Sequence, residues 1–325
     1  MSKIAKKYKS FKAELFFIKR LLAEGYGPRY WWPYVKNRFF GRFLLSRLPR
    51  YEYTADPEVE MHTICQKKDI WMMASMLRSF FFYSNLRPKV IIHDDGSFDY
   101  ASAKLLENKF SNLEVWLRED RTKRVLNSPD LPEIVRKARI EGHPFLYRPI
   151  DVLVLSKAKK LIFHDSDIIY YKPPIEIIDF ITGKIDCDGL VQKLSVGSFD
   201  LMMDEYFNEK YKPNEKGVQF INGGYVILNG DKFRMDMMVE YLNHTLRSPA
   251  NYFSEMGFFA SSFAHINFKF LPTEKYVIKW PLNDNVVMKH YTSPRRYEMF
   301  AYGMDVAKKA MEKAKRGVDV SSNFE

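Results

Sequence analysis

Residues 161–167 of the 325-residue chain read LIFHDSD, and they are the most informative part of the sequence about the fold. Its apolar run has the length of a buried strand, and two carboxylates, Asp165 and Asp167, follow directly at positions i and i+2. Carboxylates at a strand end turn toward one point, and their hard oxygen atoms suit Mg²⁺ or Mn²⁺. Acidic pairs also occur in ordinary surface turns. The strand before this pair and Pro173-Pro174 after it favour a metal site that leaves coordination positions for a diphosphate.

Strand-like and helix-like segments alternate outward from this stretch. The expected strands are 61–65, 89–93, 113–117 and 160–164, and the expected helices are 69–83, 100–109, 131–141 and 149–156. Such alternation predicts the α/β class, with a mixed, mainly parallel sheet covered by helices on both faces. Ligands of such sheets bind beyond the carboxyl ends of the strands. The polar turns Asp94–Ser97 and Asp165–Asp167 are both expected at that edge.

Two later stretches carry residues that suit the same kind of site. Residues 220–229, FINGGYVILN, place Asn222, Gly223 and Gly224 before an apolar strand. Glycines let a ligand approach the backbone, and an Asn side chain exchanges hydrogen bonds with sugar hydroxyls. The alternative is a glycine bulge that enters a strand. Residues 288–296, MKHYTSPRR, offer His290 as a third metal ligand and arginines for phosphate oxygens, although a histidine beside basic residues is often only structural.

These three stretches, in this order, resemble the GT-A glycosyltransferases, and most closely the retaining glycosyltransferase family eight that includes glycogenin. The resemblance covers about residues 60–300 and implies a GT-A, Rossmann-like fold. It implies that Asp165, Asp167 and His290 bind Mn²⁺ (or Mg²⁺), which bridges the diphosphate of a nucleotide-sugar donor, with a UDP-sugar as the expected donor. Asn222 matches the Asn-x-Gly element of the family.

The remaining matches assign further donor contacts. Arg148 matches the family's donor-binding Arg before the acidic strand, and Arg295 or Arg296 takes the place of its final Lys at the diphosphate. Ser293 stands where the family has Gly in that last motif, so we expect a different phosphate turn. Glu255 falls near the acidic position of the family but lacks the Gln that usually follows it.

The turn Asp94-Asp95-Gly96-Ser97 resembles the one at which the inverting family-two glycosyltransferases hold uridine, so both acids are candidate donor contacts. The chain lacks the late Gln-x-x-Arg-Trp motif of that family, and transfer with retention is the expected outcome. In a retaining enzyme Asn222 and Glu255 would orient the sugar, whereas in an inverting one Glu255 would be the catalytic base.

Positive charge is concentrated in the first 50 residues. They hold 13 of the 51 Lys and Arg, 2 of the 40 Asp and Glu, and 12 aromatic residues, so they account for the whole net charge of +11. Helices are expected over 11–24 and 34–48. Cations beside aromatic rings suit an interfacial helix on an anionic membrane surface; alternatively, the rings pack on the main domain and the cations are solvated. We expect a basic helical arm (1–56), a GT-A domain (57–303) and a C-terminal helix and tail (304–325).

Composition and missing motifs narrow the function classes. The chain is 46% hydrophobic and 28% charged, which excludes global disorder, and its two cysteines, Cys65 and Cys187, exclude a disulfide framework or a Cys-rich zinc site. No Walker loop, Gly-x-Ser-x-Gly elbow or Gly-x-Gly-x-x-Gly motif is present. We expect a cytoplasmic transferase, peripheral at the inner face of a membrane, that acts on a glycan or lipid-linked acceptor. The rivals are a sugar nucleotidyltransferase and a non-catalytic adaptor with a degenerate transferase domain that binds membrane or nucleic acid. A nucleic-acid partner is not favoured, because the body of the chain is neutral.

Overall fold

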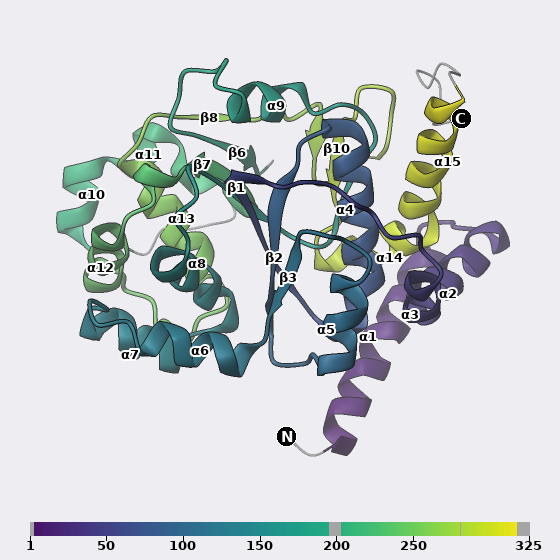
Figure 1. Cartoon of the computed structure of the whole chain (residues 1–325), viewed down its shortest axis with the longest axis horizontal. Coiled ribbons are helices and arrows are strands. Elements are labelled where there is room, and N and C mark those ends of the chain that lie inside the picture. The colour runs from purple at the N-terminus through teal and green to yellow at the C-terminus, as the bar shows by residue number, and fades with distance from the viewer. Residues whose placement is uncertain (1–2, 195–202, 280, 317–325) are drawn as a thin grey trace.

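The computed structural model describes residues 3–194, 203–279 and 281–316, and a single large sheet runs through its middle (Figure 1). Seven strands lie in the order β3-β2-β1-β4-β7-β6-β8. They are β1 (Asp56–Cys65), β2 (Pro88–Asp94), β3 (Leu113–Trp116), β4 (Lys160–His164), β6 (Gly189–Lys193), β7 (Ile221–Asn229) and β8 (Phe268–Phe270). Strand β7 is antiparallel to both of its neighbours, and the other neighbouring pairs are parallel. The predicted mixed, mainly parallel sheet is therefore confirmed.

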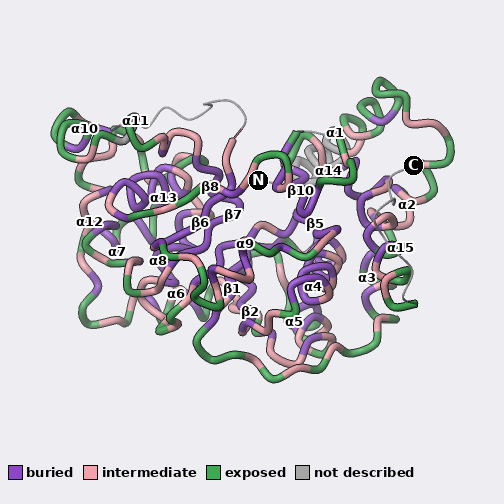
Figure 2. The backbone as a smooth tube through the Cα atoms, turned by 90° about the horizontal axis from the view of Figure 1, so that it is seen from above, coloured by how far each residue is buried: buried purple, intermediate pink, exposed green. Residues whose placement is uncertain are grey.

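Helices cover both faces of this sheet, as expected. One face carries α4 (Ile70–Ser84), α5 (Tyr100–Glu107) and α9 (Ile175–Ile181), and the other carries α6 (Arg118–Leu126), α7 (Glu133–Glu141), α8 (Pro144–Leu155), α10 (Glu205–Tyr211), α12 (Met235–His244) and α13 (Ser254–Ala264). Ile162 of β4 packs into the first layer, whereas Leu161 and Phe163 pack into the second, because successive strand residues point to opposite faces. Figure 2 shows the buried residues gathered on the strands and on α4 and α13.

Short elements complete the chain, and three of them, all strands, form a second sheet. They are α11 (Pro213–Lys216), η1 (Pro28–Tyr30), η2 (Lys67–Asp69), η3 (Val218–Phe220), η4 (Gly230–Lys232), η5 (Ser293–Arg295), η6 (Met299–Gly303), β5 (Ile168–Tyr170), β9 (Tyr276–Val277) and β10 (Met288–His290). Strand β10 lies between β5 and β9 and is antiparallel to β5, which places His290 opposite Ile168. Since β5 starts one residue after Asp167, this pairing brings His290 to the acidic pair from far along the sequence.

The N-terminal arm forms three α-helices rather than the two expected. Helix α1 (Lys3–Ala23) contains most of the first expected helix, but the second is divided into α2 (Trp31–Phe39) and α3 (Gly41–Ser46). At the division, a Cβ on Gly41 would lie only 2.6 Å from the Cβ of Trp71 in α4. The prediction of one helix over 34–48 is therefore wrong, because the backbone at the glycine packs directly on α4 and the chain turns there.

Part of the arm packs on the body of the protein. Leu21 and Tyr34 are buried in a cluster with Tyr297 and Phe300, and Asn37 donates to the carbonyl oxygen of Phe300 at 2.9 Å. For these residues the alternative expectation holds, with rings packed on the main domain. The division at residue 56 stays a prediction.

Other boundaries differ from the expected ones. Helix α6 had no counterpart among the expected helices, and α8 begins at Pro144 rather than at 149. The glycine pair 223–224 lies within β7 and not before it. Helix α15 (Met304–Lys315), which follows α14 (Arg296–Glu298) and η6, matches the expected C-terminal helix, and the expected tail 317–325 lies outside the described residues.

Candidate active site

A cavity of about 440 Å³ opens at the carboxyl ends of β1 and β4. Its walls come from the ends of these strands, the start of β7, the first turn of α13 and the loop after β10. The stretches LIFHDSD, FINGGYVILN and MKHYTSPRR all contribute to it, so residues that are distant in sequence meet at the edge of the sheet where ligands of such folds bind.

Strand pairing explains why the three stretches meet. Because β7 runs opposite to β4, its first residues lie beside the last residues of β4, and the Asp165 N–H donates to the Gly224 carbonyl oxygen at 2.8 Å. In the small sheet, the Tyr291 N–H donates to the Asp167 carbonyl oxygen at 2.7 Å. The reversed direction of β7 and the pairing of β10 with β5 thus position the site.

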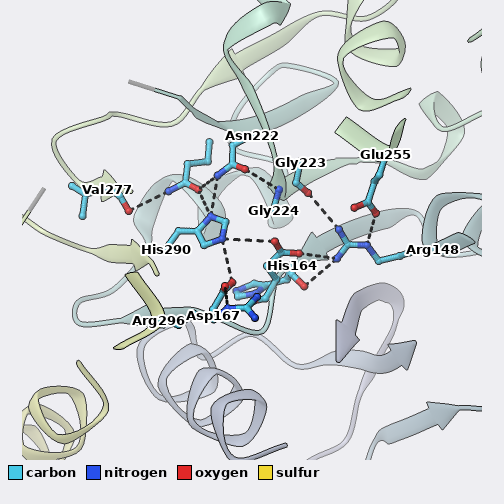
Figure 3. A network of polar contacts seen from close by, with 12 residues as sticks. Arg148, His164, Asp167, Asn222, Gly223, Gly224, Glu255, Val277, His290 and Arg296 are labelled. Atoms are coloured by element: carbon cyan, nitrogen blue, oxygen red, sulfur yellow. Dashed lines mark hydrogen bonds and ion pairs between the residues drawn. The ribbon is translucent and has the colours of Figure 1, made fainter. Parts of the chain in front are cut away.

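Asp165, Asp167 and His290 each turn a ligand atom toward one point, and these atoms all lie within 4.8 Å of one another. Figure 3 shows His290 pointing at Asp167, with its Nε2 atom 3.2 Å from Asp167 Oδ1 and 3.7 Å from Asp165 Oδ2. Asp167 Oδ1 is buried, and within the described residues its contact is the ion pair with His290 Nε2. Two carboxylates and an imidazole whose ligand atoms face one another are a donor set that fits Mn²⁺ or Mg²⁺.

Two arginines balance the charge of the acidic pair. Arg296 Nε donates to Asp167 Oδ2 at 2.7 Å, and Arg148 Nη1 lies 3.4 Å from Asp165 Oδ1. Burial opposes ionisation of Asp167, but Arg296 and His290 outweigh it and hold its pKa below the usual range. Burial likewise opposes the charged form of His290, and the two aspartates outweigh it and raise its pKa. The charges of Asp167, Arg296 and His290 therefore stabilise one another.

The ring of His290 is held from behind by two amides. Asn222 Nδ2 lies 2.9 Å from His290 Nδ1 and donates to Gln192 Oε1 at 2.7 Å, while Gln192 Oε1 itself lies 3.2 Å from His290 Nδ1. Asn222 Oδ1 accepts from the Gly224 N–H at 3.1 Å. The hydrogen bonds of Asn222 are thus made within the protein, where they fix the ring so that Nε2 faces the aspartates. Gln192 was not predicted as a site residue; the only indication in the sequence is that it is a polar residue inside the apolar run GLVQK.

Arg148 and Glu255 form a buried pair beside the candidate metal ligands (Figure 3). Arg148 is fully buried, and its Nε atom lies 2.8 Å from Glu255 Oε1. Its Nη2 atom donates to the Gly223 carbonyl oxygen at 3.4 Å. Burial raises the pKa of Glu255 to about 7, and Arg148 acts in the opposite direction. Arg148 lies behind the wall of the cavity, where it orients Glu255 and Asp165, and Glu255 lines the cavity itself.

The chain is similar to known proteins in structure, but no match was found by sequence. No protein-family model matches the chain, and no curated protein sequence matches it. The bifunctional glycosyltransferase WbbM is similar with a TM-score of 0.49 and 12% identity over 81% of this chain and 53% of that one, so the chain spans about half of WbbM. Mouse xyloside xylosyltransferase 1 is similar with a TM-score of 0.47 and 8% identity, covering 73% of this chain and 98% of that one. For the galactosyltransferase LgtC, solved with donor and acceptor sugar analogs, the TM-score is 0.46 and the identity 12%, over 78% of this chain and 96% of that one.

The other residues expected at the donor divide into two groups. Asp95, Gly223, Gly224, Ser293 and Arg296 line the cavity, whereas Asp94 and Arg295 do not. Asp94 is 3% exposed, and its Oδ1 atom accepts backbone N–H bonds from residues 96, 97 and 98, so it shapes the turn. Arg295 is paired with Glu298. The sequence did not single out the aromatic residues that also line the cavity.

Replacing Gly224 by Ala is expected to disable the candidate metal site. A Cβ at this position would lie 2.3 Å from His290 Cε1 and 2.7 Å from Asp165 Oδ2, so at least one candidate ligand must move. We expect Mn²⁺ affinity, measured by the loss of the free-ion signal in electron paramagnetic resonance, to fall about 10- to 100-fold. Gly223→Ala is the matched control, because its Cβ would meet its nearest neighbour at an ordinary 3.4 Å. Equal affinities of the two variants would contradict this geometry.

Proposed function

We propose that the protein is a divalent-metal-dependent glycosyltransferase that moves a hexose from a nucleotide sugar, with UDP as the expected nucleotide, to an acceptor hydroxyl with retention of configuration. One observation carries the proposal. Asp165, Asp167 and His290 turn their ligand atoms toward one point in a cavity at the carboxyl ends of parallel strands, directly beside Glu255 and the glycines of β7. The family resemblance in the sequence supports the same conclusion.

Each part of the cavity has a role in this proposal. A cation held by Asp165, Asp167 and His290 would neutralise the negative charge that develops on the departing diphosphate. Arg296, already oriented by Asp167, and Ser293 would donate hydrogen bonds to phosphate oxygens from the loop after β10. The end of β1 would receive the base and ribose.

The sugar would lie against the start of β7, whose Gly223 and Gly224 line the cavity. Glu255, oriented by Arg148, would fix the hydroxyls of the sugar or of the acceptor. The cavity volume of about 440 Å³ lies in the range of small-molecule sites, although a nucleotide sugar with an acceptor would extend beyond it.

A thermal-shift panel of UDP, GDP, CDP and TDP, each with and without Mn²⁺, tests the proposal. A ligand that binds only the folded state adds about 2.7 kcal/mol of stability at 100 times its dissociation constant. We expect one nucleotide to stabilise the protein only in the presence of Mn²⁺, which would also name the donor base. If no nucleotide raises the melting temperature, the transferase proposal fails and the adaptor alternative is favoured.

We propose further that the arm binds an anionic membrane surface. Trp31, Trp32, Phe39, Phe40 and Phe43 are each between 48% and 66% exposed, and Arg42 in α3 and Arg47 directly after it are exposed as well. Rings at the level of the lipid headgroups and cations over anionic lipid are the two interactions that hold an interfacial helix. No helix within residues 3–194, 203–279 and 281–316 has the length and apolarity to cross a bilayer.

The double variant Trp32→Ala/Phe43→Ala is expected to lower binding to vesicles that contain anionic lipid by at least about tenfold, because burial of each ring contributes about 1.5–3 kcal/mol. Flotation of the full chain with liposomes measures the bound fraction. Tyr206→Ala/Leu246→Ala is the matched control, since these side chains are 54% and 65% exposed on other elements. Unchanged flotation of the arm variant, or an equal loss in the control, would refute a membrane role of the arm.

A further inference from the structure

One wall of the cavity is aromatic, and the proposed donor site does not use it. Four of the lining side chains, His143, Phe145, Tyr252 and Phe253, form what we call the aromatic shelf. Neighbouring ring centroids lie 5.0 to 5.4 Å apart, so the rings form one connected surface. Tyr252 is 53% exposed and Phe253 44% exposed, although burying such rings in the core would be favourable.

The shelf is held in place from two sides. His143 and Phe145 begin α8, while Tyr252 and Phe253 directly precede α13, and these two helices pack side by side (Figure 1). The loops are tied together because the His143 N–H donates to the Pro249 carbonyl oxygen at 2.8 Å. The Tyr252 hydroxyl also interacts with the side chain of Ser293 from the loop after β10. The aromatic surface is therefore preformed.

The chemistry of the shelf differs from that of the rest of the cavity. Most charged side chains of the cavity come from other segments: η2, the turn after β2, the end of β4, and β10 with the loop after it. Glu255 of α13 is the charged residue nearest to the shelf in the sequence, and the shelf itself carries three carbocyclic rings and one imidazole. Partial burial lowers the pKa of His143, so its ring is neutral at pH 7. A diphosphate would find no counter-charge on the shelf. An uncharged ring with one apolar face suits it better.

Glu255 connects the two halves of the cavity. It lies in the first turn of α13, two residues after Phe253, and Arg148 bridges it to the metal ligands through contacts of 2.8 Å to Glu255 and 3.4 Å to Asp165. A ring on the shelf is thus adjacent to the carboxylate that would lie beside the transferred sugar. This is the position that an acceptor hydroxyl needs.

We propose that the aromatic shelf binds a neutral hexopyranose of the acceptor glycan, with the C–H face of the sugar stacked on the exposed ring of Tyr252 and a hydroxyl directed toward Glu255. The ring of Phe145 is inclined by 70° to that of Tyr252 and would bound the sugar on one side. This inference rests on the proposed transferase function. The ring face and the phenol hydroxyl of Tyr252 together suit a sugar, which is apolar on one face and polar at its rim. The shelf thereby defines an acceptor class: an uncharged terminal sugar rather than a phosphate or a carboxylate group.

Saturation-transfer NMR with the methyl glycosides of glucose, galactose, mannose and N-acetylglucosamine, in both anomeric forms, tests the proposal on the full chain with UDP and Mn²⁺ present. We expect at least one glycoside to bind the wild type, and Tyr252→Ala to bind it about tenfold more weakly. Tyr252→Phe, which keeps the ring, should restore most of the affinity. Tyr206→Ala, which removes an exposed tyrosine elsewhere on the surface, should leave it unchanged.

The Mn²⁺-dependent shift with nucleotide, measured on the same variants, separates this inference from the function on which it rests. If the wild type and Tyr252→Ala both show the nucleotide shift but bind the glycosides with equal affinity, the proposed sugar-binding role of the aromatic shelf is wrong. The proposed transferase function is then unaffected. Absence of binding by every glycoside would also overturn the sugar-binding role of the shelf. If the nucleotide shift itself is absent, the proposed function fails, whatever the glycosides do.

Discussion

Asp167→Asn is expected to abolish the Mn²⁺-dependent stabilisation of the protein by its nucleotide. The variant loses a negative charge from the pair of carboxylates, and its amide turns either a neutral oxygen or an N–H group toward the position now occupied by the buried Oδ1 atom, which faces His290 Nε2. Neither replaces an anionic oxygen as a ligand of a hard cation. At a nucleotide concentration of 100 times the wild-type dissociation constant, the increment of about 2.7 kcal/mol should disappear.

Asp130→Asn is the control for this variant, because it makes the same chemical change at an exposed loop position. Each variant is compared with its own melting temperature without ligand, since Asp167→Asn also weakens the pairing with Arg296. Asn at 167 is nearly isosteric with Asp and keeps an oxygen for that arginine, so the fold should survive. An Asp167→Asn variant with the full increment would show that Asp167 is not a metal ligand.

Arg148→Met is expected to lower the free energy of unfolding by about 3–5 kcal/mol, the usual effect of removing one partner from a buried ion pair. Arg148 is fully buried and supplies the counter-charge for both Glu255 and Asp165. Met fills a similar volume but leaves Glu255 without its paired cation, Asp165 with His290 in place of two cations, and the Gly223 carbonyl oxygen without its donor. Urea denaturation at pH 7 measures the loss. Arg234→Met is the matched control, because its pair with Asp236 is exposed and should contribute at most about 1 kcal/mol.

The double variant Arg148→Met/Glu255→Gln separates charge from packing. If the large effect comes from the unpaired carboxylate, neutralising Glu255 should recover about 0.5–3 kcal/mol of the stability lost in Arg148→Met. A double variant less stable than Arg148→Met would mean that the arginine acts mainly through its backbone contacts and its volume.

The main elements of the fold could be predicted from the sequence because each carries a local signal. Apolar runs of strand length at 61–65, 89–93 and 160–164 match β1, β2 and β4, and the helical segment 69–83 matches α4. The division of the second arm helix at Gly41 could not be predicted, because the cause is contact with Trp71, a residue of another element. Local signals also predicted the acidic pair and His290 as one site, with family resemblance supplying the link between them.

The partners of these site residues were not predictable in the same way. Nothing near Arg148 in the sequence shows that it lies between Glu255 and Asp165, and nothing near Gln192 shows that it lies behind His290. Likewise, Asp94 looks like a donor contact in the sequence, whereas the structure shows its carboxylate bound to the backbone of its own turn. Hydrogen-bond partners depend on which elements neighbour each other, and that information is distributed over the whole chain.

The α/β class, the charge of the arm and the identity of the metal-ligand candidates could be predicted from the sequence, because hydrophobic period, composition and residue chemistry are local properties. Where those candidates meet follows from the tertiary structure. Strand β7 runs against its neighbours and so brings its glycines to the end of β4, and β10 pairs with β5 and so brings His290 to Asp167. It also gathered the aromatic shelf from the starts of two helices. Strand direction and register follow from the packing of the complete core, which no single segment specifies.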